Sequence, residues 1–192
     1  SLLLNQGERQ KFPDSSMTVS KHPSSLTVRL DSPLKTMEFG QLLAKALTDG
    51  SILALTGELG SGKTQFTRGI GVGLGVPEEQ ITSPTFTLIQ EYPSSPPLIH
   101  VDLYRLETPG EIGSLGLVEY FQEPYIVIIE WAERMHDALP TDHLCLEFVY
   151  GEQQDTRIVS FHGAGPKSQT AVDRIQTLLS HEGQHTFPQV NH

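Results

Sequence analysis

Cysteine, tryptophan and asparagine are all scarce in this chain of 192 residues. Cys145 has no second cysteine in the chain with which to form a disulfide bond, a usage typical of reducing compartments. No apolar run approaches the roughly 20 residues that a membrane-spanning helix needs. The leucines at positions 2–4 end at Asn5, short of the roughly 7–15 apolar residues of a signal peptide. We therefore expect a soluble, cytoplasmic protein with no membrane contact.

Positive charge is also in short supply. The 13 Lys and Arg residues face 23 Asp and Glu residues, which gives a net charge of -10 at pH 7. Such a chain repels the polyphosphate backbone of nucleic acids at long range, so nucleic-acid binding by this chain on its own is disfavoured. Hydrophobic residues make up 37% of the chain and charged residues 19%. This balance favours a packed core over a fully disordered chain.

The two ends of the chain lack a regular apolar pattern. Residues 1–25 hold prolines and paired serines among scattered charges, so we expect a disordered tail that is partly derived from cloning, with Met17 as a candidate natural start. Residues 26–162 carry the patterns of an ordered domain. Residues 163–192 are polar, and we expect one helix near residues 171–179 followed by a disordered end.

One motif in the polar extension resembles a metal site. Residues 181–185, His-Glu-Gly-Gln-His, fit the zinc-protease pattern H-E-x-x-H. That pattern needs a buried helix and a third ligand from further along the fold. Gly183 and Pro188 disfavour such a helix, so we expect a solvated tail here.

Apolar patterns in the central domain predict alternating strands and helices. Continuous apolar runs at 51–56 and 125–129 are typical of parallel strands that are buried on both faces. Paired runs separated by turn residues predict two antiparallel hairpins. The sum is an α/β domain of three layers, whose mixed sheet has a parallel core and antiparallel hairpin additions. The remaining strands are expected at 26–30, 85–92, 98–102, 144–150 and 157–161. Helices are expected at about 33–50 and 63–74, and a capping box at 108–111 predicts the start of a short third helix.

A phosphate-binding loop comes directly after the first buried strand. Residues 57–64 read Gly-Glu-Leu-Gly-Ser-Gly-Lys-Thr and match G-x-x-x-x-G-K-[ST] in full, between a strand and a helix. The three glycines can take positive φ, which turns successive backbone N–H groups inward around phosphate oxygens. The helix adds the positive end of its dipole. Lys63 is expected to reach the β- and γ-phosphates and Thr64 to contact Mg²⁺, so residues 26–162 are predicted to form a P-loop NTPase-like ATPase domain.

A P-loop site also needs a carboxylate at the end of a neighbouring strand. Glu130 follows the apolar strand 125–129 and is our choice for this Walker B role. Asp102 closes the strand before it in the chain and is the second candidate. Either acid has a plainer interpretation as a helix N-cap, and the sequence leaves open which of them orients the attacking water. His100 is expected to be a structural side chain rather than a base.

The motifs that the sequence lacks narrow the choice of nucleotide. The chain's two asparagines, Asn5 and Asn191, both lie in the ends, so the Asn-Lys-x-Asp segment with which many GTPases read guanine is absent. The seven arginines are scattered, and no insertion is long enough for the lid of a small kinase. An ATPase is therefore favoured. A small-molecule or nucleoside kinase and a non-catalytic nucleotide-binding scaffold stay open as alternatives.

Four motifs together resemble those of the TsaE (YjeE) family, the P-loop ATPases of bacterial tRNA threonylcarbamoyladenosine (t6A) synthesis. They are the loop at 57–64, Thr-Ser-Pro-Thr-Phe at 82–86, His-Val-Asp-Leu-Tyr-Arg-Leu at 100–106 and Ile-Ile-Glu-Trp at 128–131. They occur in the family's order and spacing, and the resemblance covers residues 26–162. The P-loop alone is shared by many families, whereas the set of four is far more specific.

The resemblance implies a role for each matching residue. Lys63, Asp102 and Glu130 are implied to be catalytic, and Thr64 and Glu130 to hold Mg²⁺. The implied protein is a weak ATP hydrolase that binds TsaD and TsaB homologues and resets them while TsaD modifies adenosine-37, so that tRNA is contacted only indirectly. The implied ATP-binding residues are Glu58, Leu59, Gly60, Ser61, Gly62, Lys63, Thr64, Gln65, Thr85 and Trp131.

Overall fold

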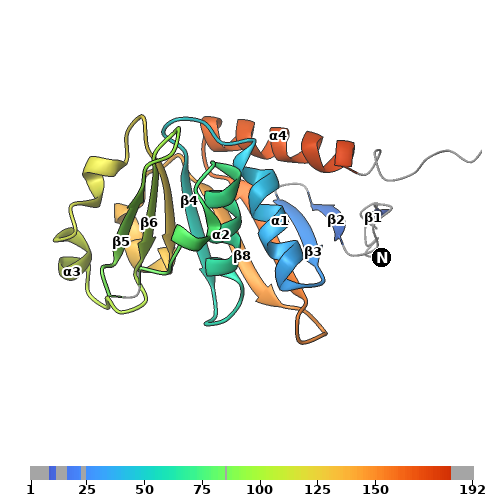
Figure 1. The fold of residues 1–192 in the computed structure, drawn as a ribbon, viewed down its shortest axis with the longest axis horizontal. Helices are drawn as coiled ribbons and strands as arrows, with labels where there is room; N and C mark the ends of the chain where they lie inside the picture. Colours follow the sequence, from blue (N-terminus) through green and yellow to red (C-terminus); the bar gives the residue numbers. More distant parts are fainter. Residues whose placement is uncertain (1–8, 12–16, 23–24, 85, 183–192) are drawn as a thin grey trace, which may run out of the picture.

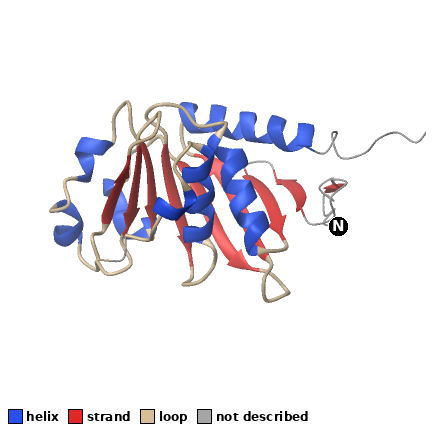
Figure 2. Cartoon of the chain, in the orientation of Figure 1, coloured by secondary structure: helices blue, strands red, loops and turns tan. Residues whose placement is uncertain are grey.

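A computed structural model describes residues 9–11, 17–22, 25–84 and 86–182. Within them, strands from both ends of the chain join one mixed sheet (Figures 1 and 2). The strands are β1 (Arg9–Lys11), β2 (Met17–His22), β3 (Ser25–Leu30), β4 (Ile52–Gly57), β5 (Ile89–Tyr92), β6 (Leu98–Asp102), β7 (Ile126–Glu130), β8 (Leu144–Tyr150) and β9 (Arg157–Gly163). Their order across the sheet is β1-β2-β3-β9-β8-β4-β7-β6-β5.

Helices cover both faces of the sheet and give three layers. The helices are α1 (Pro33–Ala44), α2 (Lys63–Gly73), α3 (Pro109–Gly113) and α4 (Pro166–Glu182), with short 3₁₀ turns η1 (Glu78–Gln80), η2 (Leu117–Tyr120) and η3 (Ala132–Ala138). Apolar side chains of α1, α2 and α4 share one buried cluster, and those of α3, η2 and η3 share another on the opposite face. The predicted three-layer α/β fold is therefore confirmed.

The centre of the sheet is parallel, as the apolar runs predicted. β4 pairs in parallel with both β7 and β8, and β7 pairs in parallel with β6. The hairpins β5–β6 and β8–β9 are antiparallel additions on either side. Every residue of β7 is buried, because helices or turns cover it from both faces.

The strand register brings the candidate site residues to one edge of the sheet. Leu55, near the end of β4, lies opposite Glu130, and Glu130 lies opposite Asp102. Side chains alternate between the two faces of a strand. Leu98 and Ile126 belong to the cluster beneath α1 and α2, so Asp102 and Glu130, an even number of residues further on, point to that same face.

Two elements are shorter than the sequence predicts. The first helix ends at Ala44, not at Gly50, because a turn comes after it in which Ser51 Oγ accepts the Thr48 N–H at 3.0 Å. Ala46, just past the end of the helix and before that turn, stays buried, which is why the apolar pattern outlasts the helix. The strand expected at 85–92 begins only at Ile89, because Leu88 has a φ of 63° and closes a turn with Pro84.

The ends of the described chain also hold regular structure. β1 and β2 lie within the segment expected to be a tail, and β2 pairs with β3 along its whole length. α4 occupies the polar extension, with Ile175 and Leu179 buried, and the zinc-like motif continues past its end into residues outside those described. The division into tail, domain and extension stays a prediction. None of the helices in the described ranges has the length and apolar composition to cross a membrane.

Candidate nucleotide site

The loop between β4 and α2 has the backbone that its glycines predict. Gly57, Gly60 and Gly62 have φ values of 140°, 77° and 104°, a region that L side chains rarely adopt. At Gly57 a Cβ atom would also lie 2.4 Å from the carbonyl oxygen of Phe148 on β8. A side chain at this position is therefore excluded by both conformation and space. The loop leads directly into the first turn of α2.

Lys63 is the buried cation of this loop. Its side chain is 4% exposed and donates hydrogen bonds to the carbonyl oxygens of Gly57 and, at 2.8 Å, Glu58. Burial lowers the pKa of the Lys63 ammonium, and the negative charges of Glu130, Glu133 and Asp102 act against that shift. The pKa of Lys63 is therefore lowered on balance, and the three carboxylates limit the shift.

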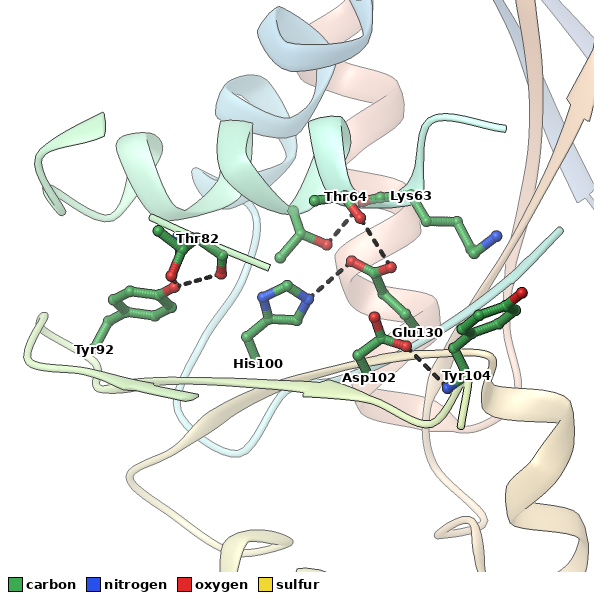
Figure 3. Close-up of polar contacts among 9 residues, drawn as sticks. Lys63, Thr64, Thr82, Tyr92, His100, Asp102, Tyr104 and Glu130 are labelled. Atoms are coloured by element: carbon green, nitrogen blue, oxygen red, sulfur yellow. Dashed lines mark hydrogen bonds and ion pairs between the residues drawn. The ribbon is translucent and has the colours of Figure 1, made fainter. Parts of the chain in front are cut away.

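Glu130 ends β7 with both carboxylate oxygens in contact with other residues (Figure 3). Thr64 Oγ1 donates to Glu130 Oε2 at 3.1 Å, and His100 Nε2 lies 2.8 Å from Glu130 Oε1. Glu130 is 2% exposed, so these contacts replace hydration. The structure thus brings together Thr64 and Glu130, two oxygen-bearing side chains of the kind that Mg²⁺ prefers.

Asp102 lies beside Glu130 but in a wetter position. It ends β6, is partly exposed, and its Oδ1 accepts the backbone N–H of Tyr104 at 3.0 Å. Burial raises the pKa of the Asp102 carboxyl and the charge of Glu130 adds to this, although the Tyr104 N–H lowers it. Asp102 is therefore a stronger base than an ordinary aspartate.

Trp131 forms a wall of the site next to Lys63. Its backbone is in the left-handed region, with a φ of 59°, as β7 gives way to η3. Its ring lies 4.5 Å from Lys63 Nζ, 5.1 Å from the ring of Tyr104 and 5.3 Å from the Arg134 guanidinium. Arg134 in turn donates to three backbone carbonyls of residues 103–106. These contacts fix the loop that comes after Asp102.

The hairpin β8–β9 braces the outer side of the phosphate-binding loop. Tyr150 Oη donates to the carbonyl of Leu59, and Arg157 Nη2 donates to the carbonyl of Gly60 at 3.1 Å. The Arg157 guanidinium also lies 4.6 Å from the centre of the Tyr150 ring. Two loop carbonyls are thus held by contacts from the hairpin.

The other predicted ATP-binding residues differ in position. Ser61 is buried and its Oγ accepts from Lys63 at 3.3 Å, whereas the Leu59 side chain is 66% exposed. The Gln65 side chain turns to α1, where its amide donates to Met37 Sδ at 3.8 Å. Thr85 lies outside the described residues.

The sequence predicts His100 as a structural side chain but not its contact with Glu130, and it does not single out Tyr150 or Arg157. His100 carried a usable signal, because it precedes Asp102 by two positions on a strand and must share its face. Tyr150 and Arg157 carried none, since they reach the loop from positions 91 and 97 residues away.

This strand, loop and helix, with an acid on the adjacent parallel strand, define a nucleotide-binding protein of the P-loop NTPase class. A family model described as "Threonylcarbamoyl adenosine biosynthesis protein TsaE" matches residues 30–159. The chain therefore belongs to the TsaE family, whose members take part in t6A biosynthesis, and the resemblance seen in its motifs is confirmed.

Relatives and a solved structure agree with this assignment. The chain is 46% identical over 123 residues to the tRNA threonylcarbamoyladenosine biosynthesis protein TsaE of Nostoc sp., covering 62% of this chain and 74% of the relative. It is 35% identical to TsaE of Bacillus subtilis over 148 residues, or 77% and 91% of the two chains. It resembles the crystal structure of Bacillus subtilis YdiB with a TM-score of 0.64 and 31% identity, covering 87% of this chain and 100% of that one.

Proposed function

We propose that this protein is a Mg²⁺-dependent ATP hydrolase that binds TsaD and TsaB homologues and resets them between rounds of t6A modification at adenosine-37. The observation that carries the proposal is the contact between Thr64 on the phosphate-binding loop and Glu130 on the adjacent strand, 3.1 Å apart. P-loop NTPases hold Mg²⁺ with a Ser or Thr of the loop and a Walker B carboxylate, usually Asp, and here Thr64 and Glu130 hold these two places. The family's description supports the link to tRNA modification.

Phosphate binding would fall to the loop. Its amides and the N-terminus of α2 are a ready site for an anion. The Lys63 ammonium, buried among Glu130, Glu133 and Asp102, is the group that offsets charge on the β- and γ-phosphates. The braced carbonyls of Leu59 and Gly60 keep the loop amides preorganised for this task.

Magnesium fits the oxygen donors of the site. Thr64 and Glu130 would hold it, with phosphate and water as its remaining ligands, because the described residues contain no cluster of three or more metal-ligating side chains. When bound, Mg²⁺ neutralises charge on the phosphate oxygens.

We assign the two carboxylates to different tasks. Glu130 is 2% exposed and both its oxygens are engaged, so it suits the metal side of the site. Asp102 is closer to solvent, from which the attacking water comes, and its pKa is raised by burial. Asp102 is therefore our choice for the group that orients this water.

We expect the site to hydrolyse ATP weakly in the chain alone and to be completed by the proposed partners. The net charge of -10 makes direct capture of tRNA by this chain unfavourable, so tRNA would be held by TsaD and TsaB. Two exposed apolar side chains belong to the phosphate-binding loop and to the segment that contacts Arg105: Leu59 is 66% exposed, and Phe86 is 84% exposed with its ring 4.6 Å from the Arg105 guanidinium. Such a rim is suited to burial against a protein.

Assembly with the partners tests the proposal. We expect the chain, TsaD and TsaB to sediment as one complex when Mg²⁺ and a non-hydrolysable ATP analogue are present, and to separate without nucleotide. Lys63→Ala, which removes the phosphate-facing cation, should abolish the nucleotide effect. The absence of nucleotide-dependent assembly would count against the proposal, and transfer of phosphate to a small acceptor would identify a kinase instead.

A further inference from the structure

His100 lies beneath the site, on the same face of β6 as Asp102. The face runs from Leu98 through His100 to Asp102, from the apolar core to the open edge of the sheet. His100 is 0% exposed, so it is too deep to reach a nucleotide or a partner. Its position therefore limits it to acting through a neighbouring side chain.

That neighbour is Glu130. His100 Nε2 lies 2.8 Å from Glu130 Oε1, and the two side chains are 1% and 3% exposed. Figure 3 shows the imidazole of His100 and the hydroxyl of Thr64 pointing at different oxygens of the carboxylate. The carboxylate is thus held at each oxygen by a different residue, which fixes its plane as well as its position.

The other ring nitrogen identifies the tautomer. His100 Nδ1 is buried and has no hydrogen-bond partner in the described part of the chain. A buried N–H without an acceptor is costly, whereas Nε2 faces a carboxylate oxygen that can accept. The proton therefore lies on Nε2, and His100 is the donor in this contact.

We infer that His100 is a positioning residue for the hydrolysis reaction: its Nε2–H holds Oε1 of Glu130 so that Oε2 faces Thr64 and the metal site. This inference rests on the proposed ATPase function. Thr64 is itself a proposed metal ligand, so its hydroxyl has a second task. His100 has no second ligand of this kind, so its hydrogen bond orients Glu130 throughout the cycle of ATP binding and hydrolysis.

Two substitutions separate this role from simple packing. His100→Leu fills similar space without a donor, whereas His100→Gln can place an amide N–H near the position of Nε2. We expect His100→Leu to lower kcat for partner-stimulated phosphate release by about 10- to 100-fold, the range for a hydrogen bond to a charged group. The affinity for an ATP analogue, followed by the fluorescence of Trp131, should change by less than about threefold because the phosphate loop is intact. His100→Gln should recover most of kcat, and His143→Leu, which removes a histidine from outside the site, is the control.

A double-mutant cycle tests whether His100 acts through Glu130. In a Glu130→Gln background, which keeps a low residual rate, His100→Leu should cause little further loss, because the two residues act as a unit. An equal, independent loss in both backgrounds would overturn the inference. So would wild-type kcat in His100→Leu, or a His100→Gln variant as impaired as His100→Leu.

A spectroscopic measurement decides the point without any activity. In the ¹⁵N spectrum of the full histidine-labelled chain, the His100 ring should carry its proton on Nε2, and that signal should shift in Glu130→Gln. An unprotonated Nε2 overturns the inference even if His100→Leu fails to fold. If this signature is present but the wild-type chain with TsaD and TsaB releases no phosphate, the proposed function fails and the orientation of Glu130 by His100 stands.

Discussion

At the scale of single residues, Trp131 links the metal-side acid to the phosphate-side cation. It follows Glu130 directly, and its indole lies 4.5 Å from Lys63 Nζ. A ring over a partly desolvated ammonium stabilises its charge and shields it from water.

The ring should contribute to nucleotide affinity. Trp131→Ala is expected to weaken the binding of a non-hydrolysable ATP analogue by about 2- to 30-fold, the range for losing a cation–π contact at a partly buried site. Trp131→Phe, which has the same backbone strain and keeps a ring, should lose less than half of that effect. Isothermal titration calorimetry measures both. Unchanged affinity in Trp131→Ala would show that the ring over Lys63 contributes nothing, and equal losses in Ala and Phe would show that an aromatic ring by itself is not the cause.

The two carboxylates should fail in different ways. Asp102→Asn is expected to lower phosphate release by about 100-fold or more, the lower limit for removing a general base, while the Mg²⁺ dependence of nucleotide binding is retained. Glu130→Gln should lower both the rate and the Mg²⁺ dependence. Binding titrations with and without Mg²⁺, together with phosphate release, distinguish the two. The reverse pattern would exchange the roles that we assign to Asp102 and Glu130.

At the scale of elements, the β8–β9 hairpin is a brace for the phosphate loop. Tyr150 and Arg157 reach the carbonyls of Leu59 and Gly60 across the sheet edge. The strands β4 and β8 stay paired as far as Gly57 opposite Phe148, which brings the hairpin within reach. Loop conformation therefore depends on an element that contains no phosphate-binding residue of its own.

Removing one contact of the brace should loosen nucleotide binding. Tyr150→Phe deletes the hydroxyl that donates to Leu59 and keeps the ring that stacks on Arg157. We expect an affinity loss of about 2- to 10-fold, in line with one neutral hydrogen bond. Tyr125→Phe, on the core face away from the loop, is the matched control. Unchanged affinity in Tyr150→Phe would mean that the loop keeps its shape without this contact.

α4 depends on a cap that comes from outside the helix. Asp142 accepts the backbone N–H groups of Lys167 at 2.8 Å and Ser168 at 3.0 Å, in the first turn of α4. Burial raises the pKa of Asp142, but the hydrogen bonds from Ser168 and Lys167 outweigh it and hold the pKa below its ordinary value of 3.8. The charged carboxylate therefore stabilises the folded state.

This cap should give a pH-dependent stability. Asp142→Ala is expected to lower the free energy of unfolding by about 0.5–2 kcal/mol at pH 7, as for other lost caps. Because the folded pKa is depressed, the contribution is complete above the unfolded value and disappears as the pH falls through the folded one. Urea unfolding at pH 7 and in the acid range measures this, with Asp155→Ala, at an exposed loop position, as the control. A difference that persists unchanged in acid would contradict a charged cap.

At the scale of the whole molecule, the architecture could be predicted because two signals agreed. The apolar runs that became β4 and β7 have the pattern of strands buried on both faces, and the glycine motif requires a phosphate-binding turn and a helix directly after β4. Parallel pairing of these strands then places Glu130 beside the loop. Two adjacent buried strands and one specific motif are enough to predict the fold and the Thr64–Glu130 pair of the site.

The remaining contacts of the site join residues that are far apart in the sequence. The partner of His100 is 30 positions away and the loop carbonyl held by Tyr150 is 91 positions away, and neither pairing leaves a local pattern. Element ends are decided by single turns, as at Ala44, where the apolar period continues although the helix has stopped. Such features require the packed chain.

The whole molecule also extends beyond the family match. Residues 30–159 match the family model, whereas α4 lies after them and buries Val172, Ile175 and Leu179 in the same core as α1 and α2. β2 likewise extends the sheet at the edge formed by β3. These additions enlarge the fold on the side of the sheet away from β5 and β6 (Figure 1). They leave unobstructed the carboxyl ends of β4, β6 and β7, where the candidate nucleotide site lies.

The most direct test of the central claim is phosphate release from Mg-ATP by the chain alone and by the chain with TsaD and TsaB. We predict slow release alone, clear stimulation by the pair, and a fall of both rates to a low residual level in Glu130→Gln. Fast release that is indifferent to the pair, or stimulation that survives in Glu130→Gln, would contradict a partner-completed ATPase built on the Thr64–Glu130 site.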